Sequence, residues 1–177
     1  MLRTSKGMSD DQISQMTRHI ERLAADEGLK PYFVADNQVG NTSLAHELAT
    51  WAAEQGKAEE IWSLLFKAYF GEKRSIFDMD SLVALAGEIG LDETEAREAL
   101  ESRRYAEKVR NDATEMQQLG GNGVPFVVVD RKYGIAGAQP LESFIQTIDA
   151  AWKERSPLTV VTASEGDGAV CGPEGCD

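Results

Sequence analysis

The chain of 177 residues carries thirty acidic and eighteen basic side chains, and its net charge of −12 opposes the phosphate neutralisation on which non-specific nucleic-acid binding depends. The same sign disfavours anionic membrane surfaces, and no apolar run approaches the ~20 residues of a membrane-spanning helix. With 42% hydrophobic residues, the composition is that of a globular domain with its own core. No apolar segment follows the basic start, so we expect a cytoplasmic protein.

The first expected element is an amphipathic helix over residues 9–28. Ser9 and Gln12 have the spacing of a capping box, and Gly28 is placed to end the helix. Its apolar face repeats at helical intervals and consists of Ile13, Met16, Ile20 and Leu23. A short extended piece follows over residues 31–36.

A second helix is expected over residues 42–56, with a buried stripe formed by Leu44, Leu48, Trp51 and Ala52. The next segment, AEEIWSLLFKAYFGE, predicts a helix that is apolar almost all round, which indicates that several neighbours cover it. Its aromatic run favours core packing over the alternative, a hydrophobic substrate groove.

Two further helical regions precede a change of pattern at Gly120. Residues 78–90 form a short helix with Asp78 or Asp80 as the N-cap, and Gly90 lies beyond its end. Residues 92–120 predict one or two helices, with Asp92 as the cap and a break near Ser102.

The segment PFVVVD, residues 125–130, predicts a strand that is covered on both faces and therefore lies inside a sheet. Residues 133–138 are its expected hairpin partner, joined through Arg131 and Lys132. A last helix over residues 139–155 has Pro140 in its first turn, and a flexible tail follows Pro157. Because a two-stranded hairpin is only marginally stable alone, either helices and residues 31–36 cover its open edge, or the fold expects strands not encoded here.

The two cysteines, Cys171 and Cys176, lie at the end of the sequence, so no disulfide staples the core. Neither they nor His19 and His46 have the spacing of zinc ligands, and we expect neither a metal nor a cofactor. A lone helical histidine such as His46 is more often structural than catalytic. The C-x4-C spacing contains turn-forming Gly and Pro, so it fits either a reversible redox pair or two exposed thiols with no selected role.

Four segments together resemble the FrnE-type branch of the DsbA-like thiol–disulfide oxidoreductases: NTSLAH, LFKAYFGE, IFDMDSLVALAGEIGLDETEAREAL and, above all, GVPFVVVDRKYGIAGAQPLESFIQTIDAAW. The resemblance implies an α-rich α/β protein, namely a thioredoxin-like fold with a helical insertion, over residues 7–155, followed by the tail of residues 156–177. The family's N-terminal βαβ unit with its C-x2-C pair has no counterpart before Met1, which leaves a β-hairpin and a C-terminal helix.

The resemblance also implies a cis proline at Pro125 that faces the redox site, and a Val124 backbone that pairs with an extended substrate peptide. The simpler alternative is that Pro125 only begins a strand. The expected partners are thiol-containing peptides or proteins and low-molecular-weight thiols. The open strand edge also predicts self-association.

The function implied is that of a thiol–disulfide oxidoreductase or isomerase, impaired or inactive without the C-x2-C pair, with Cys171 and Cys176 as an accessory redox pair. Two alternatives stay open. One is a non-catalytic remnant that binds peptides or a partner. The other is a protein like the glutathione-dependent 2-hydroxychromene-2-carboxylate isomerases, which share the fold.

Overall fold

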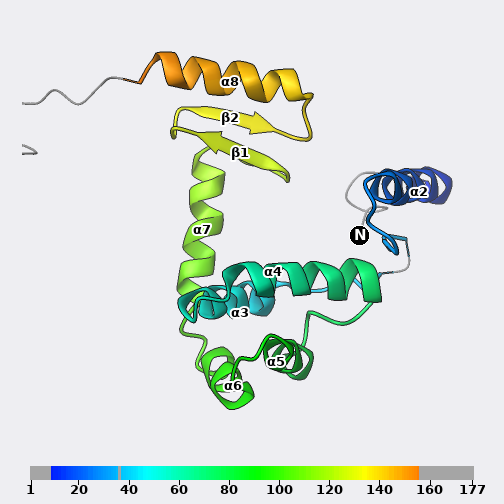
Figure 1. Cartoon of the computed structure of the whole chain (residues 1–177), viewed down its shortest axis with the longest axis vertical. Coiled ribbons are helices and arrows are strands. Elements are labelled where there is room, and N and C mark those ends of the chain that lie inside the picture. Colours follow the sequence, from blue (N-terminus) through cyan, green and yellow to red (C-terminus); the bar gives the residue numbers. More distant parts are fainter. Residues whose placement is uncertain (1–8, 36, 156–177) are drawn as a thin grey trace, which may run out of the picture. The chain divides into compact units, whose positions relative to one another are not determined.

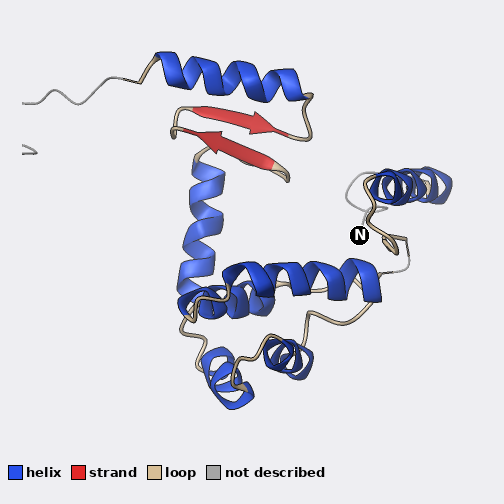
Figure 2. Ribbon diagram, in the orientation of Figure 1, coloured by secondary structure: helices blue, strands red, loops and turns tan. Residues whose placement is uncertain are grey.

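The computed structural model describes residues 9–35 and 37–155, and these residues are rich in helix. Within them the chain forms seven α-helices, one π-helical turn and a single pair of strands (Figures 1 and 2). This is the α-rich α/β composition expected from the sequence. The chain divides into two compact units, the first ending at Glu115 and the second beginning at Met116.

Helix α2, Asp10–Asp26, begins with the predicted capping box. The N–H of Gln12 donates to the Ser9 hydroxyl at 3.3 Å, and the N–H of Ser9 donates to the Gln12 side chain at 2.8 Å. Glu27 is the C-cap, and Gly28 follows it with φ +82°, a left-handed conformation that glycine adopts without steric cost. The first predicted helix is therefore confirmed together with both of its caps.

The core of the first unit lies among four helices: α3, Ser43–Glu54; α4, Ala58–Phe66; α5, Met79–Glu88; and α6, Glu93–Glu101. Helix α4 continues into the π-helical turn η1, Lys67–Gly71. Helix α3 contacts α4, α5 and α6, and α5 packs against α6 (Figure 1). Asp78 and Asp92 cap α5 and α6, and the predicted break near Ser102 is confirmed because α7, Ala106–Gln118, is a separate helix.

The largest fully buried apolar side chains come from all four of these helices: Leu48, Trp51, Ile61, Leu82, Leu85 and Leu100. Each such side chain contributes about 2 kcal/mol when it is removed from water. The stripe predicted for α3 is confirmed, since Leu48, Trp51 and Ala52 are buried and Leu44 packs against the core as a partly buried side chain.

A charged residue, Glu47, lies fully buried on α3 within this apolar core. One of its carboxylate oxygens, Oε1, lies 2.7 Å from Nη2 of Arg103, and the Nε–H of Arg103 donates to both oxygens, at 3.0 and 3.2 Å. Arg103 follows α6 and has a left-handed φ of 54°. The pair therefore ties α3 to the turn between α6 and α7, and the guanidinium compensates a carboxylate that water does not reach.

The second unit contains the strands β1, Phe126–Val129, and β2, Tyr133–Ala136, and the helix α8, Leu141–Lys153. The strands are antiparallel, with Phe126 opposite Ala136 and Val129 opposite Tyr133, and α8 lies along both (Figure 1). The predicted hairpin and closing helix are confirmed. Pro140 is the N-cap of α8, one position ahead of the first turn in which we expected it.

The expectation that β1 is covered on both faces is wrong for the described residues. Val127 and Val128 are 39% and 37% exposed, and the sheet there has only two strands. Residues 31–35 are not a further strand, because the N–H of Phe33 donates instead to the carbonyl of Phe70 at 2.7 Å. The apolar run of β1 therefore exceeds what the hairpin and α8 can bury.

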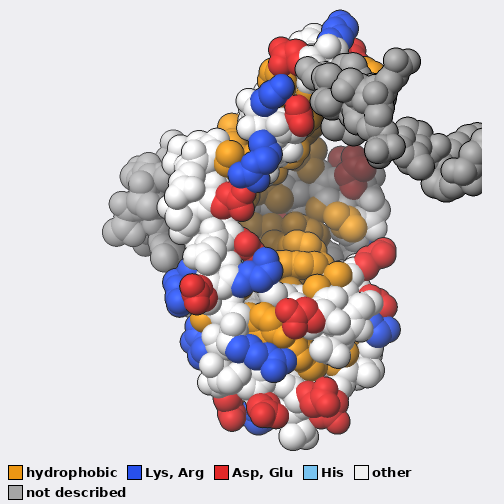
Figure 3. Space-filling model, turned by 90° about the vertical axis from the view of Figure 1, so that its left-hand side faces the viewer, with side chains coloured by type: hydrophobic (Ala, Val, Ile, Leu, Met, Phe, Trp, Pro, Cys, Tyr) orange, Lys and Arg blue, Asp and Glu red, His pale blue; other side chains and the backbone are white. Residues whose placement is uncertain are grey.

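The expectation that neighbours cover α4 all round is also wrong. Ile61 and Leu65 are buried against α3 and α5, whereas Trp62 and Phe66, on another side of the helix, are 38% and 57% exposed. The apolar face of α2 is likewise only partly covered, since Leu23 is 52% exposed. On the face shown in Figure 3, hydrophobic side chains reach the surface between acidic and basic ones.

No helix in the described part of the chain is long and apolar enough to cross a membrane. The predicted tail, including Cys171 and Cys176, lies outside the described residues.

We predict that Arg103→Ala lowers the free energy of unfolding by about 3 kcal/mol, because it leaves the buried carboxylate of Glu47 without its counter-charge. Urea denaturation followed by circular dichroism measures the change. Arg97→Ala is the matched control, since Arg97 pairs with the exposed Asp80 and its loss should cost less than about 1 kcal/mol. Equal costs for the two variants would contradict the role given to the buried pair.

A second prediction concerns pH. Hydrogen bonds from the Ser75 hydroxyl and from the Ser81 N–H and hydroxyl hold the pKa of Asp78 below its usual range. Because its pKa is lower in the folded state, Asp78 stabilises the fold at pH values above its unfolded-state pKa of about 4. This stabilisation is lost as the pH falls through the folded-state pKa. Asp78→Ala removes the N-cap of α5 and should therefore lower the free energy of unfolding by about 1 kcal/mol at pH 7. In urea titrations at several pH values the difference from the unaltered protein should shrink below pH ~4, and a constant difference would rule out this linkage.

Candidate functional site

The loop that leads into β1 is packed closely against neighbouring side chains at one glycine, Gly121. Gly120 has φ +90°, and the N–H of Gly121 donates to the carbonyl of Met116 at 2.9 Å. Gly121 is buried, and a Cβ at this position would clash with the Met116 side chain and lie 2.9 Å from the Phe126 ring. The loop is therefore packed down at Gly121, and the residues after it emerge at the surface.

Val124 and Pro125 are the exposed end of this loop. Val124 is 90% exposed, and the Val124–Pro125 peptide bond is cis, the isomer that the family resemblance implies. The carbonyl of Pro125 accepts from the N–H of Gly137 at 2.9 Å, which fastens Pro125 to the far end of β2. Neither the N–H nor the carbonyl of Val124 has a hydrogen-bond partner among the described residues.

The register of the hairpin decides which backbone groups stay open. The carbonyls of Pro125 and Val129 face β2, since they accept from Gly137 and Lys132. Because successive residues of a strand direct their polar groups to opposite edges, those of Phe126 and Val128 face the other edge. Val124 precedes β1, and among the described residues its N–H and carbonyl are unpaired in the loop. In the described residues no strand pairs with that edge. It offers alternating donors and acceptors to an extended chain.

Proline at position 125 suits this arrangement. It lacks an N–H, and the missing donor would have pointed toward β2 and not toward the open edge. Pro125 therefore removes no donor from the open edge of β1.

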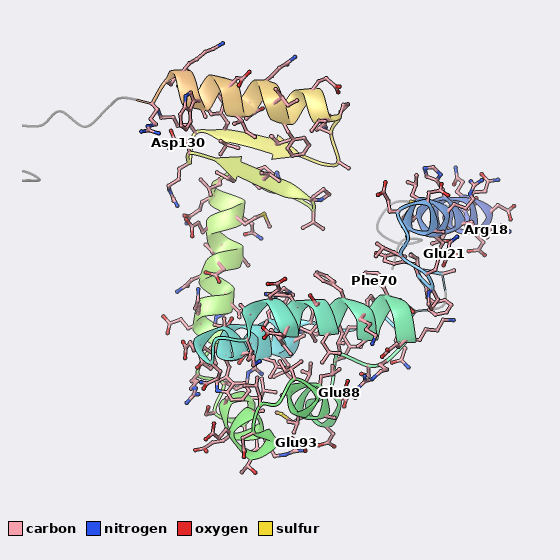
Figure 4. All side chains as sticks on the ribbon, viewed as in Figure 1. Arg18, Glu21, Phe70, Glu88, Glu93 and Asp130 are labelled. Atoms are coloured by element: carbon pink, nitrogen blue, oxygen red, sulfur yellow. The ribbon has the colours of Figure 1, made fainter. Side chains whose placement is uncertain are left out.

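The opposite end of the hairpin is closed by polar contacts. Asp130, labelled in Figure 4, and Arg131 have φ of 51° and 54° in the turn between the strands. Lys132 lies 3.7 Å from Asp130 and 3.9 Å from Glu154, which follows α8. A hydrogen bond with Glu154 raises the pKa of Tyr133. These contacts join the turn to the end of α8.

The site residues predicted from the sequence have different outcomes. Val124 and Pro125 lie together at the surface, whereas Cys171 and Cys176 lie outside the described residues. His46 lies exposed on α3 in an edge-to-face contact with Trp62, at 5.4 Å between ring centroids, and the described residues place no carboxylate in hydrogen bond with it.

The structure has an apolar pocket of about 680 Å³, lined in part by Tyr32, Phe66 and Phe70, at the aromatic run for which the sequence favoured core packing over a hydrophobic groove. Its signal was the spacing of Trp62, Phe66 and Phe70 along one side of the helix, which we assigned to the core. Tyr32 gave no signal, because its partner Phe70 is distant in the sequence. In the described part of the chain no three His, Cys, Asp or Glu side chains gather closely enough to hold a metal ion.

Comparison with known proteins assigns the chain to a family. The model of the DSBA-like thioredoxin domain matches residues 2–149, most of the chain. The chain belongs to the DSBA-like thioredoxin family. The predicted family is therefore confirmed, and the seven helices and single hairpin of the described residues fit a DSBA-like thioredoxin fold with a helical insertion.

Two similar proteins place this DSBA-like chain among known sequences and structures. The crystal structure of a probable DsbA oxidoreductase from Streptomyces coelicolor matches with a TM-score of 0.83 and 41% identity, over 100% of this chain and 74% of that one. The uncharacterized protein YwbO of Bacillus subtilis strain 168 is 41% identical over 91 residues, which are 51% of this chain and 46% of YwbO. The match thus spans about half the length of this curated relative.

We predict that Gly121→Ala loosens the loop before β1, because the added methyl group overlaps the side chains of Met116 and Phe126. Overpacking of this kind costs about 1–3 kcal/mol, so amide hydrogen exchange in β1 should accelerate about tenfold. Gly123→Ala is the matched control, since nothing lies within 4 Å of a Cβ there. Equal exchange rates in both variants would show that Gly121 does not pack the loop.

Proposed function

We propose that this chain takes part in thiol–disulfide exchange and holds an extended thiol-bearing peptide along the open edge of β1, beginning at Val124. The observation that carries the proposal is the unpaired and exposed backbone of Val124, next to Pro125, in a member of the DSBA-like family. The named structural neighbour, a probable DsbA oxidoreductase, supports the class of chemistry.

The open edge suits the main chain of a peptide more than its side chains. The polar groups of Phe126 and Val128 lie two residues apart, which is the spacing at which an added strand forms hydrogen bonds, and the unpaired groups of Val124 precede them in the loop. The exposed side chains of Val127 and Val128 add apolar surface beside that edge. A second copy of the chain can use the same edge, so the proposal includes self-association.

Exchange through this chain involves Cys171 and Cys176, because its 177 residues contain no other cysteine and no C-x2-C sequence. When these two cysteines form a disulfide, a substrate thiolate attacks one sulfur and displaces the other as a thiolate. A second substrate thiol then resolves the mixed disulfide. The substrate loses two electrons and two protons as its disulfide forms, the Cys171–Cys176 pair gains them, and glutathione disulfide restores the oxidised pair.

We propose slow exchange by this route. An ordinary cysteine thiol has a pKa of about 8.5, so only a few per cent is the reactive thiolate at neutral pH.

The order of the motifs, from NTSLAH through GVPFVVVD, supports placing the chain in the FrnE-type branch of the family.

The test of exchange runs the same steps in reverse: dithiothreitol reduces the Cys171–Cys176 pair, which then passes two electrons and two protons to a disulfide of insulin. The rate of insulin reduction is compared for the unaltered chain and the double variant Cys171→Ser/Cys176→Ser. We expect the unaltered chain to raise the rate above dithiothreitol alone and the double variant to lower it to that background. Each single variant should retain a mixed disulfide with insulin, detectable by mass spectrometry. A rate at background for the unaltered chain would overturn catalysis by this chain.

The test of peptide binding is separate and needs no thiol. Val128→Pro removes one donor from the open edge and leaves the pairing with β2 in place, so it should weaken the binding of an extended peptide with serine in place of cysteine about fivefold, the value of one hydrogen bond. Val128→Ala keeps the N–H and is the matched control. Calorimetry with unchanged affinity for Val128→Pro would exclude the open edge, whatever the outcome for insulin.

A further inference from the structure

The pocket of the first unit lies between the loop after α2 and the end of the α4–η1 helix. Its wall is aromatic. The rings of Tyr32 and Phe70 are stacked, with centroids 4.7 Å apart and planes 4° from parallel, and the ring of Phe66 lies 6.4 Å from that of Phe70. Phe66 and Leu29, both on the pocket lining, are 57% and 56% exposed. The pocket is thus an open apolar surface with flat walls.

The loop that forms one side of the pocket is fixed at several points. The N–H of Leu29 donates to the carbonyl of Ala24 at 2.8 Å, and those of Val34 and Ala35 donate to the carboxylate of Glu21, at 2.8 and 3.2 Å. The N–H of Phe33 donates to the carbonyl of Phe70 at 2.7 Å. Glu21 and Phe70 are labelled in Figure 4. The wall is held by both α2 and η1, so it exists before any ligand arrives.

The rim of the pocket is basic on a chain whose net charge is −12. Lys30 is exposed and forms no ion pair with any residue that the structure describes. The one carboxylate on the lining, Glu72, lies 3.3 Å from the cations of both Lys67 and Arg74. Its charge is matched, and the ammonium group of Lys30 remains to attract an anion.

The flat aromatic walls favour a planar ring system, and the basic rim favours a negatively charged group. We propose that this pocket binds a planar aromatic carboxylate, with its rings against Phe66 and the stacked pair of Tyr32 and Phe70, and its carboxylate toward Lys30. The volume, about 680 Å³, lies in the range of pockets that hold small organic molecules. Desolvation of this region raises the pKa of Tyr32, in agreement with a partly dry wall. The site uses none of the thiol chemistry proposed above and shares no residue with the open edge of β1.

The experiment compares two probes of equal ring size, 2-naphthoate and the neutral 2-naphthalenemethanol, by calorimetry and by amide NMR shifts of the full chain. We expect naphthoate to bind about threefold more tightly, the worth of one exposed charge pair, with shifts at Gly28 and Gly71. Phe66→Ala should weaken both probes about fivefold through loss of ring contact. Since Phe66 is more than half exposed, the variant should fold, and circular dichroism checks this.

The variant Lys30→Gln distinguishes the contribution of the Lys30 charge to binding from that of the aromatic rings of the pocket. It should abolish the preference for naphthoate and leave the affinity for the neutral probe unchanged, while Lys153→Gln, at the end of α8, should change neither. A preference that survives Lys30→Gln overturns the role of Lys30. Shifts confined to α8, with loss of binding in Trp152→Ala and not in Phe66→Ala, would place the probes on the exposed apolar side of α8 and overturn the site. An absence of shifts at millimolar probe would overturn it as well.

Discussion

The buried carboxylate of Glu47 needs one specific partner, and the first unit is arranged to supply it. A charge without water is stable there only beside the guanidinium of Arg103, which has to approach from the turn after α6. Arg103 lies directly after Ser102, the C-cap of α6, and has a left-handed φ at a position where glycine is usual. Apolar packing brings α3 and α6 together, whereas the ion pair selects one arrangement of them, because any slip between these helices would leave the carboxylate unpaired.

The same core determines which side of α4 is left exposed. Ile61 and Leu65 lie against α3 and α5, so the side chains at the next positions along the helix, Trp62 and Phe66, cannot be buried by the same neighbours. Their four-residue spacing continues through η1 to Phe70, which stacks on Tyr32 from the loop after α2. One helix thus supplies both core and pocket wall, and the wall inherits the rigidity of the core.

The helices and the hairpin could be predicted because their signals are local: a capping box at Ser9, capping aspartates at 78 and 92, and a β-branched run after Pro125. What failed were inferences about neighbours. An apolar run such as that of β1 favours burial on both faces of a sheet. The run alone does not show whether other described segments of the chain cover those faces. Glu47 resembles any glutamate on a helix surface, and the pairing of Tyr32 with Phe70 joins distant segments, so neither leaves a periodic trace. Val124 and Pro125 came from the family resemblance, and the direction of the polar groups of Phe126 and Val128 needed the register of the hairpin.

The two candidate surfaces recognise different things, and this limits what each can do. The edge of β1 presents backbone donors and acceptors, which every peptide can match, so it gives affinity with little dependence on sequence. The pocket of the first unit presents rings and a cation, which few molecules match together. Pro125 does not weaken the backbone edge of β1, since the N–H that proline lacks would have faced β2 and not the open edge. If peptides bind as proposed, selection among them cannot come from the backbone edge. It has to arise from side-chain contacts such as those of Val127 and Val128, or from the reactivity of the thiols in the proposed exchange.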